Sequence, residues 1–131
     1  MLKVYVIGAY ESSPAVRLLH TRLRMAGHEP TSSWAESARG PEDLASLTPG
    51  QCGAIWDRND QDMIDANVVV VLADTPAREG FLEAQRAFDL RKRIVWVGRP
   101  VLSVRAYIGP ASRLVVVADV EQALRALEVQ P

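Results

Sequence analysis

The sequence is poor in the features that mark secreted, membrane and nucleic-acid-binding proteins. Its one cysteine, Cys52, has no second cysteine with which to form a disulfide within the chain, as is typical of a reducing compartment. Its 15 lysines and arginines face 16 acidic residues, so a net charge of -1 provides no basic excess for a nucleic-acid polymer. No apolar run is long enough for a signal peptide or a membrane span. We therefore expect a cytoplasmic protein without membrane or nucleic-acid polymer partners.

Familiar cofactor and metal motifs are also missing. The chain contains no G-x-G-x-x-G dinucleotide fingerprint, no P-loop and no Gly-x-Ser-x-Gly nucleophile elbow. Its two histidines, His20 and His28, have no Cys, Asp or Glu at the spacing of zinc ligands. We expect neither a metal nor a redox cofactor.

The apolar residues that are present form short runs of strand length. A chain of 131 residues, 48% of them hydrophobic, suffices for one domain, 1–131, with a sheet covered on both faces. Residues 68–73, VVVVLA, are typical of a strand buried on both faces of a parallel sheet. Further strands are predicted at 2–7, 29–34, 94–97 and 114–118. With helices between them, this pattern predicts an α/β fold: a doubly wound, five-stranded parallel sheet in a flavodoxin-like or Rossmann-like three-layer sandwich, in the order 2-1-3-4-5.

Capping residues and helical periodicity place the helices. One is predicted to start at Ser12, Ser13 and Pro14 and stop at Gly27, and another to follow Asp119 as its cap. Residues 35–53 are rich in Gly, Pro, Ser and acidic residues, which predicts a long lid or binding loop.

A helix predicted at 57–66 carries an acidic cluster. Taking Met63 and Ile64 as its core-facing residues places Asn59 and Asp60 on the same inward face, four positions earlier. The same reasoning turns Asp62 and Asp65 outward as solvated charges. An inward carboxylate is costly unless it has a partner, which makes Asp60 a candidate for function.

Ligands in open α/β sheets bind beyond the carboxyl ends of the strands, and polar residues follow several predicted strands. In the loop GAYESSP, Gly8 ends the first strand, and Ser12 and Ser13 open a helix whose N–H groups could hold a phosphate or sugar oxygen. Ordinary helix capping is the alternative. After later strands come Asp74, Gly80 and Ser103, in the turn from Asp74 to Gly80 and in the connection 101–108.

Glu83 lies in the first turn of the helix predicted after the central strand. It shares a face with Ala87 and Leu90, so it points towards packed neighbours and could serve as a nucleophile or proton carrier. The alternative is a surface charge that decorates the helix start. Trp34 and Trp56 flank the predicted long loop and could stack on a base or act as packing anchors.

The order of these segments resembles the nucleoside 2-deoxyribosyltransferase-like family, which includes 2'-deoxynucleoside 5'-phosphate N-hydrolases and small phage-type relatives. The likeness covers nearly the whole chain through YVIG, AGHEPTSSW, DANVVVVLAD, GFLEAQRA and RIVWVGRP. It implies that Glu83 is the nucleophile, that Tyr5 positions it, and that Ser103 contacts a nucleotide phosphate. The family's second carboxylate falls on Asn59, with Asp60 adjacent, and its glycine-rich turn is reduced to Gly80.

This resemblance implies cleavage or transfer of the N-glycosidic bond of 2'-deoxynucleosides or their 5'-monophosphates, through an ester on Glu83 and without a cofactor. Asp60 would hold the sugar or relay a proton. Two alternatives stay open: a catalytically inactive nucleotide-binding module of the same fold, and a glycohydrolase directed at NAD or ADP-ribose.

Two further expectations concern assembly and phosphate. A homodimer or larger symmetric assembly is expected, because the apolar segment 101–108 carries Ser103, whose counterpart in the resembling hydrolases completes a neighbour's site. The GAYESSP loop lacks the basic, glycine-rich character of a phosphate loop, so a free nucleoside should compete nearly as well as its monophosphate.

Overall fold

A computed structural model describes residues 1–9, 12–36, 46–73, 78–99 and 113–128. Five strands form one parallel sheet in the order β2-β1-β3-β4-β5, which confirms the predicted topology. The strands are β1 (Lys3–Ile7), β2 (Glu29–Pro30), β3 (Val68–Leu72), β4 (Arg93–Val97) and β5 (Leu114–Val117). All five residues of β3 are buried, as expected for the centre of a parallel sheet.

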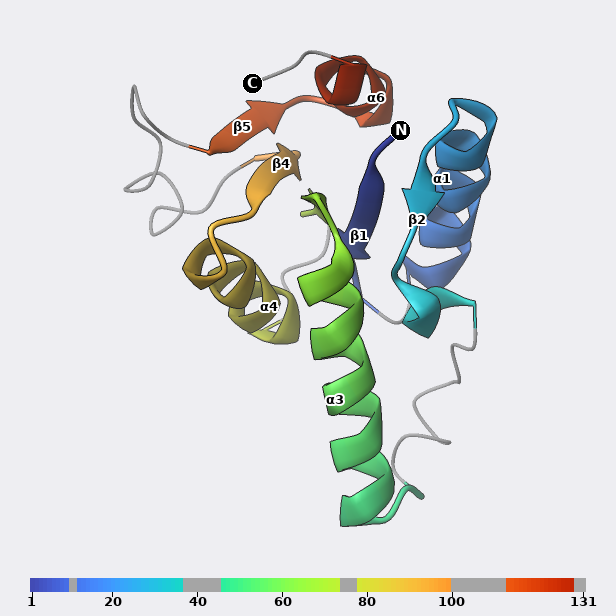
Figure 1. Ribbon diagram of the computed structural model, residues 1–131, viewed down its shortest axis with the longest axis vertical. Helices are drawn as coiled ribbons and strands as arrows, with labels where there is room; N and C mark the ends of the chain where they lie inside the picture. The colour runs from blue at the N-terminus through green and yellow to red at the C-terminus, as the bar shows by residue number, and fades with distance from the viewer. Residues whose placement is uncertain (10–11, 37–45, 74–77, 100–112, 129–131) are drawn as a thin grey trace.

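Helices cover both faces of the sheet (Figure 1). On one face lie α1 (Ser13–Met25) and α6 (Val120–Glu128), joined by an ion pair between Arg22 and Glu121. On the other lie α3 (Pro49–Asp65) and α4 (Arg78–Asp89). No helix in the described part of the chain is long and apolar enough to cross a membrane.

Several helix ends lie where the local sequence predicts them. Helix α1 ends just before Gly27, whose φ of 85° suits a residue without a side chain. Asp119 caps α6, because its Oδ1 accepts a hydrogen bond from the Gln122 backbone N–H at 2.8 Å.

The second strand is shorter than predicted, and the expectation of a strand through Trp34 is wrong. Only Glu29–Pro30 pair with β1, and Ser33–Ala35 form a short 3-10 helix, η2. Side-chain bonds turn the chain here: Ser32 Oγ accepts from the Val6 backbone N–H, and the Asp62 carboxylate accepts from both the backbone N–H and the hydroxyl of Ser33.

Helix α3 begins at Pro49 and not at residue 57, so it occupies part of the predicted long loop. Thr48 and Gln51 form a capping box, in which each side chain accepts a hydrogen bond from the other residue's backbone N–H. Figure 1 shows the first half of this helix extending away from the sheet. Of the remaining residues of the predicted loop, 37–45 lie outside the described residues.

Two predictions about the faces of α3 are also wrong. Ile64 is 40% exposed, whereas Met63 is 2% exposed, because residues one apart on a helix point about 100° away from each other. Asp62 is half-buried and holds η2, so it is a structural anchor and not a solvated charge.

Candidate active site

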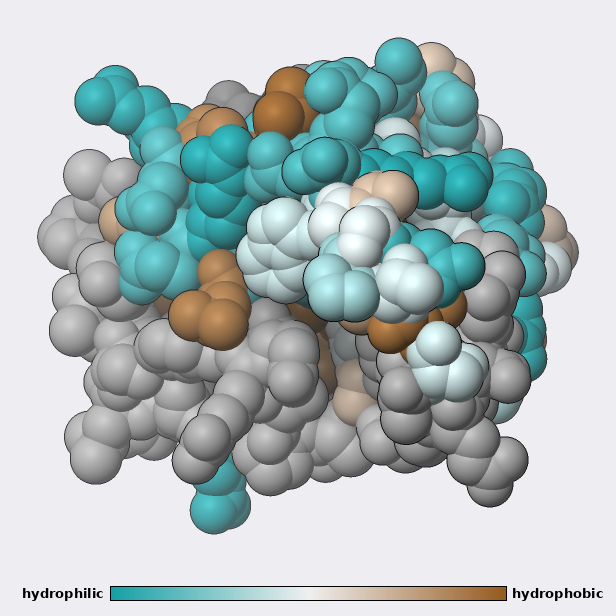
Figure 2. Space-filling model, turned by 90° about the horizontal axis from the view of Figure 1, so that it is seen from below, coloured by the Kyte–Doolittle hydropathy of each residue, from teal (hydrophilic) through white to brown (hydrophobic). Residues whose placement is uncertain are grey.

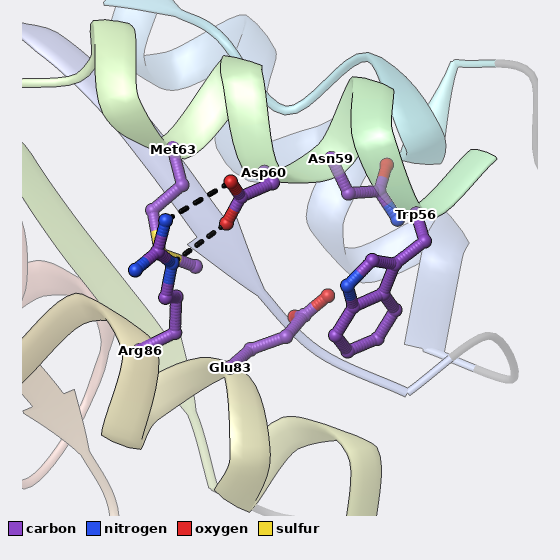
Figure 3. A pocket seen from close by; sticks show the side chains of 6 residues that line it. All are labelled: Trp56, Asn59, Asp60, Met63, Glu83 and Arg86. Atoms are coloured by element: carbon purple, nitrogen blue, oxygen red, sulfur yellow. Dashed lines mark hydrogen bonds and ion pairs between the residues drawn. The ribbon is translucent and has the colours of Figure 1, made fainter. Parts of the chain in front are cut away.

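Helices α3 and α4 line a small, shallow pocket that is open to solvent (Figure 3). The described residues that line it are Trp56, Asn59, Asp60, Met63, Glu83 and Arg86. The four residues from α3 follow the i, i+3, i+4, i+7 spacing of one helix face. Helix α4 follows β3 in the chain, so its first turns lie beyond the carboxyl end of the central strand, where ligands bind in such sheets.

Glu83 occupies the second turn of α4, because the helix begins at Arg78 and Gly80 is already helical. The expectation of a first-turn position for Glu83 is therefore wrong, and helix-dipole stabilisation of its charge is weaker than supposed. The side chain is half-buried, and its neighbour one turn on, Ala87, is fully buried. Figure 3 shows the carboxylate extending from α4 towards Asn59 and Trp56 on α3.

Tyr5 lies beneath Glu83 on the central part of the sheet. Its side chain is 0% exposed, and its hydroxyl lies 3.5 Å from Glu83 Oε1, at the long limit for a hydrogen bond. The phenol can donate to the carboxylate and so restrict its orientation. The structure thus brings together two residues separated by 78 positions in the chain.

Asp60 faces the same pocket and is paired with Arg86. The Arg86 guanidinium donates from Nε to Asp60 Oδ1 at 2.8 Å and from Nη2 to Oδ2 at 3.1 Å. This hydrogen-bonded cation lowers the pKa of Asp60 below its ordinary value of 3.8, so the carboxylate is an anion at neutral pH. Such a group accepts hydrogen bonds but has no proton to give.

Sequence reasoning identified Asp60 but missed Arg86 and Met63 as lining residues. Arg86 lies three positions after Glu83, and this i, i+3 spacing was a signal that it shares a face with Glu83. Its pairing across helices with Asp60 was not visible in the sequence.

Gly8, Ser12 and Ser13 are not among the described residues that line this pocket. A Cβ on Gly8 would lie 3.1 Å from Val16 Cγ2, so the glycine permits close packing of α1 on β1. Ser12 is the N-cap of α1 without a side-chain capping bond, and Ser13 is buried, with its Oγ 3.4 Å from Arg17 Nη1.

Trp34 lies in the core and not on the pocket. It is 8% exposed, and its indole N–H donates to the Val6 carbonyl at 3.0 Å, which matches the packing-anchor alternative. The tryptophan that lines the pocket is Trp56. Asp74 and Ser103, together with the segment 101–108, lie outside the described residues.

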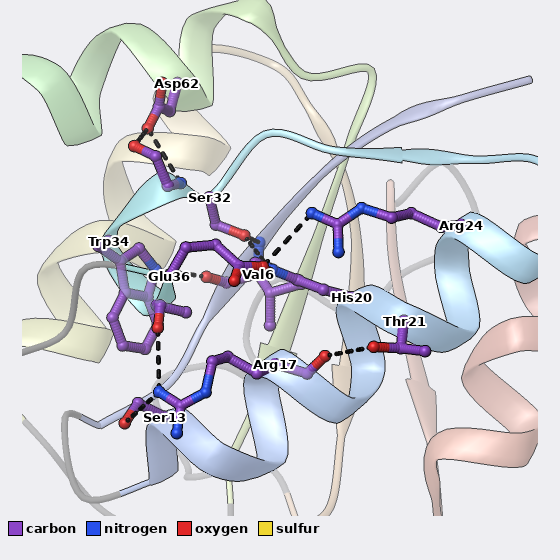
Figure 4. A network of polar contacts seen from close by, with 12 residues as sticks. Val6, Ser13, Arg17, His20, Thr21, Arg24, Ser32, Trp34, Glu36 and Asp62 are labelled. Atoms are coloured by element: carbon purple, nitrogen blue, oxygen red, sulfur yellow. Dashed lines mark hydrogen bonds and ion pairs between the residues drawn. The ribbon is translucent and has the colours of Figure 1, made fainter.

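A serine, a histidine and a glutamate form a second polar cluster (Figure 4). His20 Nε2 lies 2.7 Å from Ser32 Oγ, and His20 Nδ1 lies 2.8 Å from Glu36 Oε1. Despite this triad-like order, Ser32 is 1% exposed and its Oγ already accepts from the Val6 N–H. The cluster therefore ties α1, β1 and η2 together, without access for a substrate.

Metal-binding groups do not gather elsewhere in the described residues. No set of three or more His, Cys, Asp or Glu side chains there is arranged to hold an ion.

Comparison with known proteins gives a structural match. No family model matches the sequence, and no curated protein matches it. Among solved structures, the fold is similar to that of BcmB, a CMP N-glycosidase of Clostridium botulinum, with a TM-score of 0.63 and 14% identity. The match covers 96% of this chain and 98% of that one. At this identity the similarity shows a shared three-layer α/β fold.

Proposed function

We propose that this protein cleaves or transfers the N-glycosidic bond of 2'-deoxynucleosides or their 5'-monophosphates, with Glu83 as the nucleophile. The observation that carries the proposal is the position of the Glu83 carboxylate, in a pocket between two helices and within 3.5 Å of the buried Tyr5 hydroxyl. Its neighbours there include Asn59 and Asp60, the positions on which the resembling family's second carboxylate falls. A solved N-glycosidase with the same fold supports this class of reaction.

In the proposed reaction, a Glu83 oxygen attacks the anomeric carbon as the bond to the base breaks. The bonding electrons leave with the base, which takes up a proton from water. Water then cleaves the sugar ester and releases a proton, or a second base attacks and gives a transfer product. Tyr5, by donating to one oxygen of Glu83, would leave the other directed at the sugar.

Asp60 would hold the sugar and not relay a proton. Its pKa is lowered by Arg86, so it stays ionised through the neutral range and can accept a hydrogen bond from a sugar hydroxyl. Asn59, one residue earlier on α3, would supply an uncharged donor and acceptor beside it.

Any monophosphate would depend on Ser12, Ser13 and the N-terminus of α1, and Gly8 would let the backbone approach the ligand closely. Asp74, Gly80 and Ser103 would also contact the substrate, a proposal that the sequence pattern and the family resemblance support. A competition assay in which a free nucleoside inhibits nearly as well as its monophosphate would agree with this weak phosphate site, and a hundredfold preference for the monophosphate would contradict it.

A second candidate is a non-catalytic nucleotide-binding module. The observation in its favour is that Asp60 is engaged by Arg86 while the position aligned with the family's second carboxylate is an amide, Asn59. A binder needs the pocket but not a reactive carboxylate pair.

Covalent trapping separates the two candidates. The protein is incubated with 2-deoxy-2-fluoronucleosides and their monophosphates, quenched in acid and analysed by intact and peptide mass spectrometry. We expect a glycosyl adduct on Glu83, none in Glu83→Gln, and an unchanged adduct in the control Asp89→Asn, which alters an exposed carboxylate on the same helix. Absence of both adduct and base release over the whole panel would favour the binding module.

A further inference from the structure

We infer that the indole of Trp56 is the platform on which the base of the bound nucleotide stacks, an inference that rests on the proposed function. Of the three tryptophans in the chain, Trp34 and Trp96 are 8% and 5% exposed, whereas Trp56 is 53% exposed. The buried two donate their indole N–H groups to the carbonyls of Val6 and Arg99. Packing in the core therefore explains Trp34 and Trp96 but not Trp56.

The position of Trp56 along α3 also sets it apart. Residues 49–54 of this helix are all exposed, and the helix extends here beyond the sheet (Figure 1). A large aromatic side chain at such a site gains little from burial in the folded protein. Its indole lines the pocket instead, on the same helix face as Asn59, Asp60 and Met63.

Across the pocket, the indole lies opposite Glu83. Figure 3 shows the Glu83 carboxylate, from α4, extending towards the Trp56 ring system, from α3. In the proposed reaction Glu83 attacks the anomeric carbon, to which the base is directly bonded. Because the carboxylate attacks on the side of that carbon opposite to the base, the base itself does not rest on Glu83. Trp56, from the other helix, is the one flat aromatic side chain among the described lining residues on which the base can stack.

The described residues at the projecting end of α3 do not form the large apolar patch that is typical of a protein-binding face. Viewed from the end at which α3 projects, the described residues are mainly hydrophilic, with hydrophobic ones in small separate groups (Figure 2). Protein-binding faces usually present a larger continuous apolar patch.

Stacking on an indole depends on the flat face of a base and not on its hydrogen-bonding edge, so every base is accepted. Trp56 would therefore recognise that a base is present and contribute little to the choice between bases. By stacking, it would also keep the base in one orientation while the bond to the sugar breaks.

The test compares Trp56→Ala and Trp56→Phe in a Glu83→Gln background, which prevents turnover while affinities are measured by calorimetry. The ligands are the four 2'-deoxynucleoside 5'-monophosphates and, as a base-free control, 2-deoxyribose 5-phosphate. Loss of a stacked base should weaken nucleotide binding by roughly 10-fold to 100-fold in Trp56→Ala. The phenyl ring of Trp56→Phe should restore most of it, and Leu18→Ala, at a 64% exposed position on α1, should change nothing.

Binding of the base-free sugar phosphate should be the same in all variants. Equal nucleotide affinity in Trp56→Ala and its parent, or an equal loss for the base-free ligand, would overturn the platform. A Glu83 adduct in the otherwise wild-type protein, together with unaffected Trp56 variants, overturns the platform but leaves the proposed chemistry standing. Base-dependent binding through Trp56 without any adduct or base release overturns the chemistry and supports the platform in a binding protein.

Discussion

Replacing Glu83 by glutamine tests the proposed chemistry at the single atom on which it depends. The amide has nearly the size of the carboxylate, and its oxygen can still accept the long hydrogen bond from Tyr5, 3.5 Å away in the wild type. What disappears is the negative charge of the attacking oxygen. Pocket shape should therefore be kept while the ester-forming step is lost.

The expected loss of activity is large and the expected loss of stability small. Without its nucleophile, the enzyme should release base at least about 10³-fold more slowly, a rise of about 4 kcal/mol in the barrier. Because glutamine keeps the size of the side chain and the acceptor for Tyr5, and because the helix dipole contributes little in the second turn of α4, the free energy of unfolding should change by less than about 1 kcal/mol.

The assay is chromatographic base release from a panel of deoxynucleosides and their monophosphates, run beside thermal melts. Asp89→Asn, an exposed carboxylate later on α4, serves as the matched control and should keep full activity. Undiminished turnover in Glu83→Gln would refute the mechanism. A fall in Tm of more than about 5 °C would instead show that the substitution had damaged the fold.

Four other outcomes are expected. Asp60→Asn should slow base release less than Glu83→Gln does. Because the lowered pKa of Asp60 keeps it ionised, the wild-type rate should show no titration of Asp60 between about pH 5 and 8. A pH dependence of the rate in this range that disappears in Asp60→Asn would contradict this. Asp62→Ala should lower the free energy of unfolding in urea by about 1.5 to 3 kcal/mol, because a charged acceptor is taken from the Ser33 N–H and hydroxyl; an unchanged midpoint would refute the anchoring role. The hydrogen bond from His20 lowers the pKa of Glu36 below its ordinary 4.5, so the stabilisation by Glu36 should be complete above pH 4.5 and should decline as the pH falls further. The Tm of Glu36→Gln should therefore fall less steeply at acid pH than the Tm of the wild type, and an equal slope would show that the bond is unimportant. Light scattering at roughly tens of micromolar should show a dimer or larger assembly, and a monomer would remove that expectation.

The sequence by itself determined the architecture, because the signals for it are local or periodic. An unbroken β-branched run such as Val68–Val71 is favoured only where both faces of a strand are covered, and strands of this kind separated by helices leave few arrangements. Gly27 and Asp119 marked helix ends through the backbone conformation or the hydrogen bond that each residue type favours.

Local signals did not determine where elements ended when a distant side chain intervened. The second strand stops early because Ser32 and Ser33 are bonded to β1 and to α3, and the partner Asp62 lies 29 positions from Ser33. The early start of α3 is different, since the capping box of Thr48 and Gln51 was present in the sequence beside Pro49, but the surrounding Gly and Pro residues favoured a loop.

The candidate site shows the same division. Periodicity placed Glu83 and Asp60 on inward faces of their own helices, but a helix face does not say which side chain it meets. Only the tertiary structure decided that Arg86, 26 positions from Asp60, pairs with it, and that the hydroxyl of Tyr5 reaches Glu83. The reason is physical: hydrogen bonds and ion pairs depend on separations in space, and packing the helices on the sheet sets those separations.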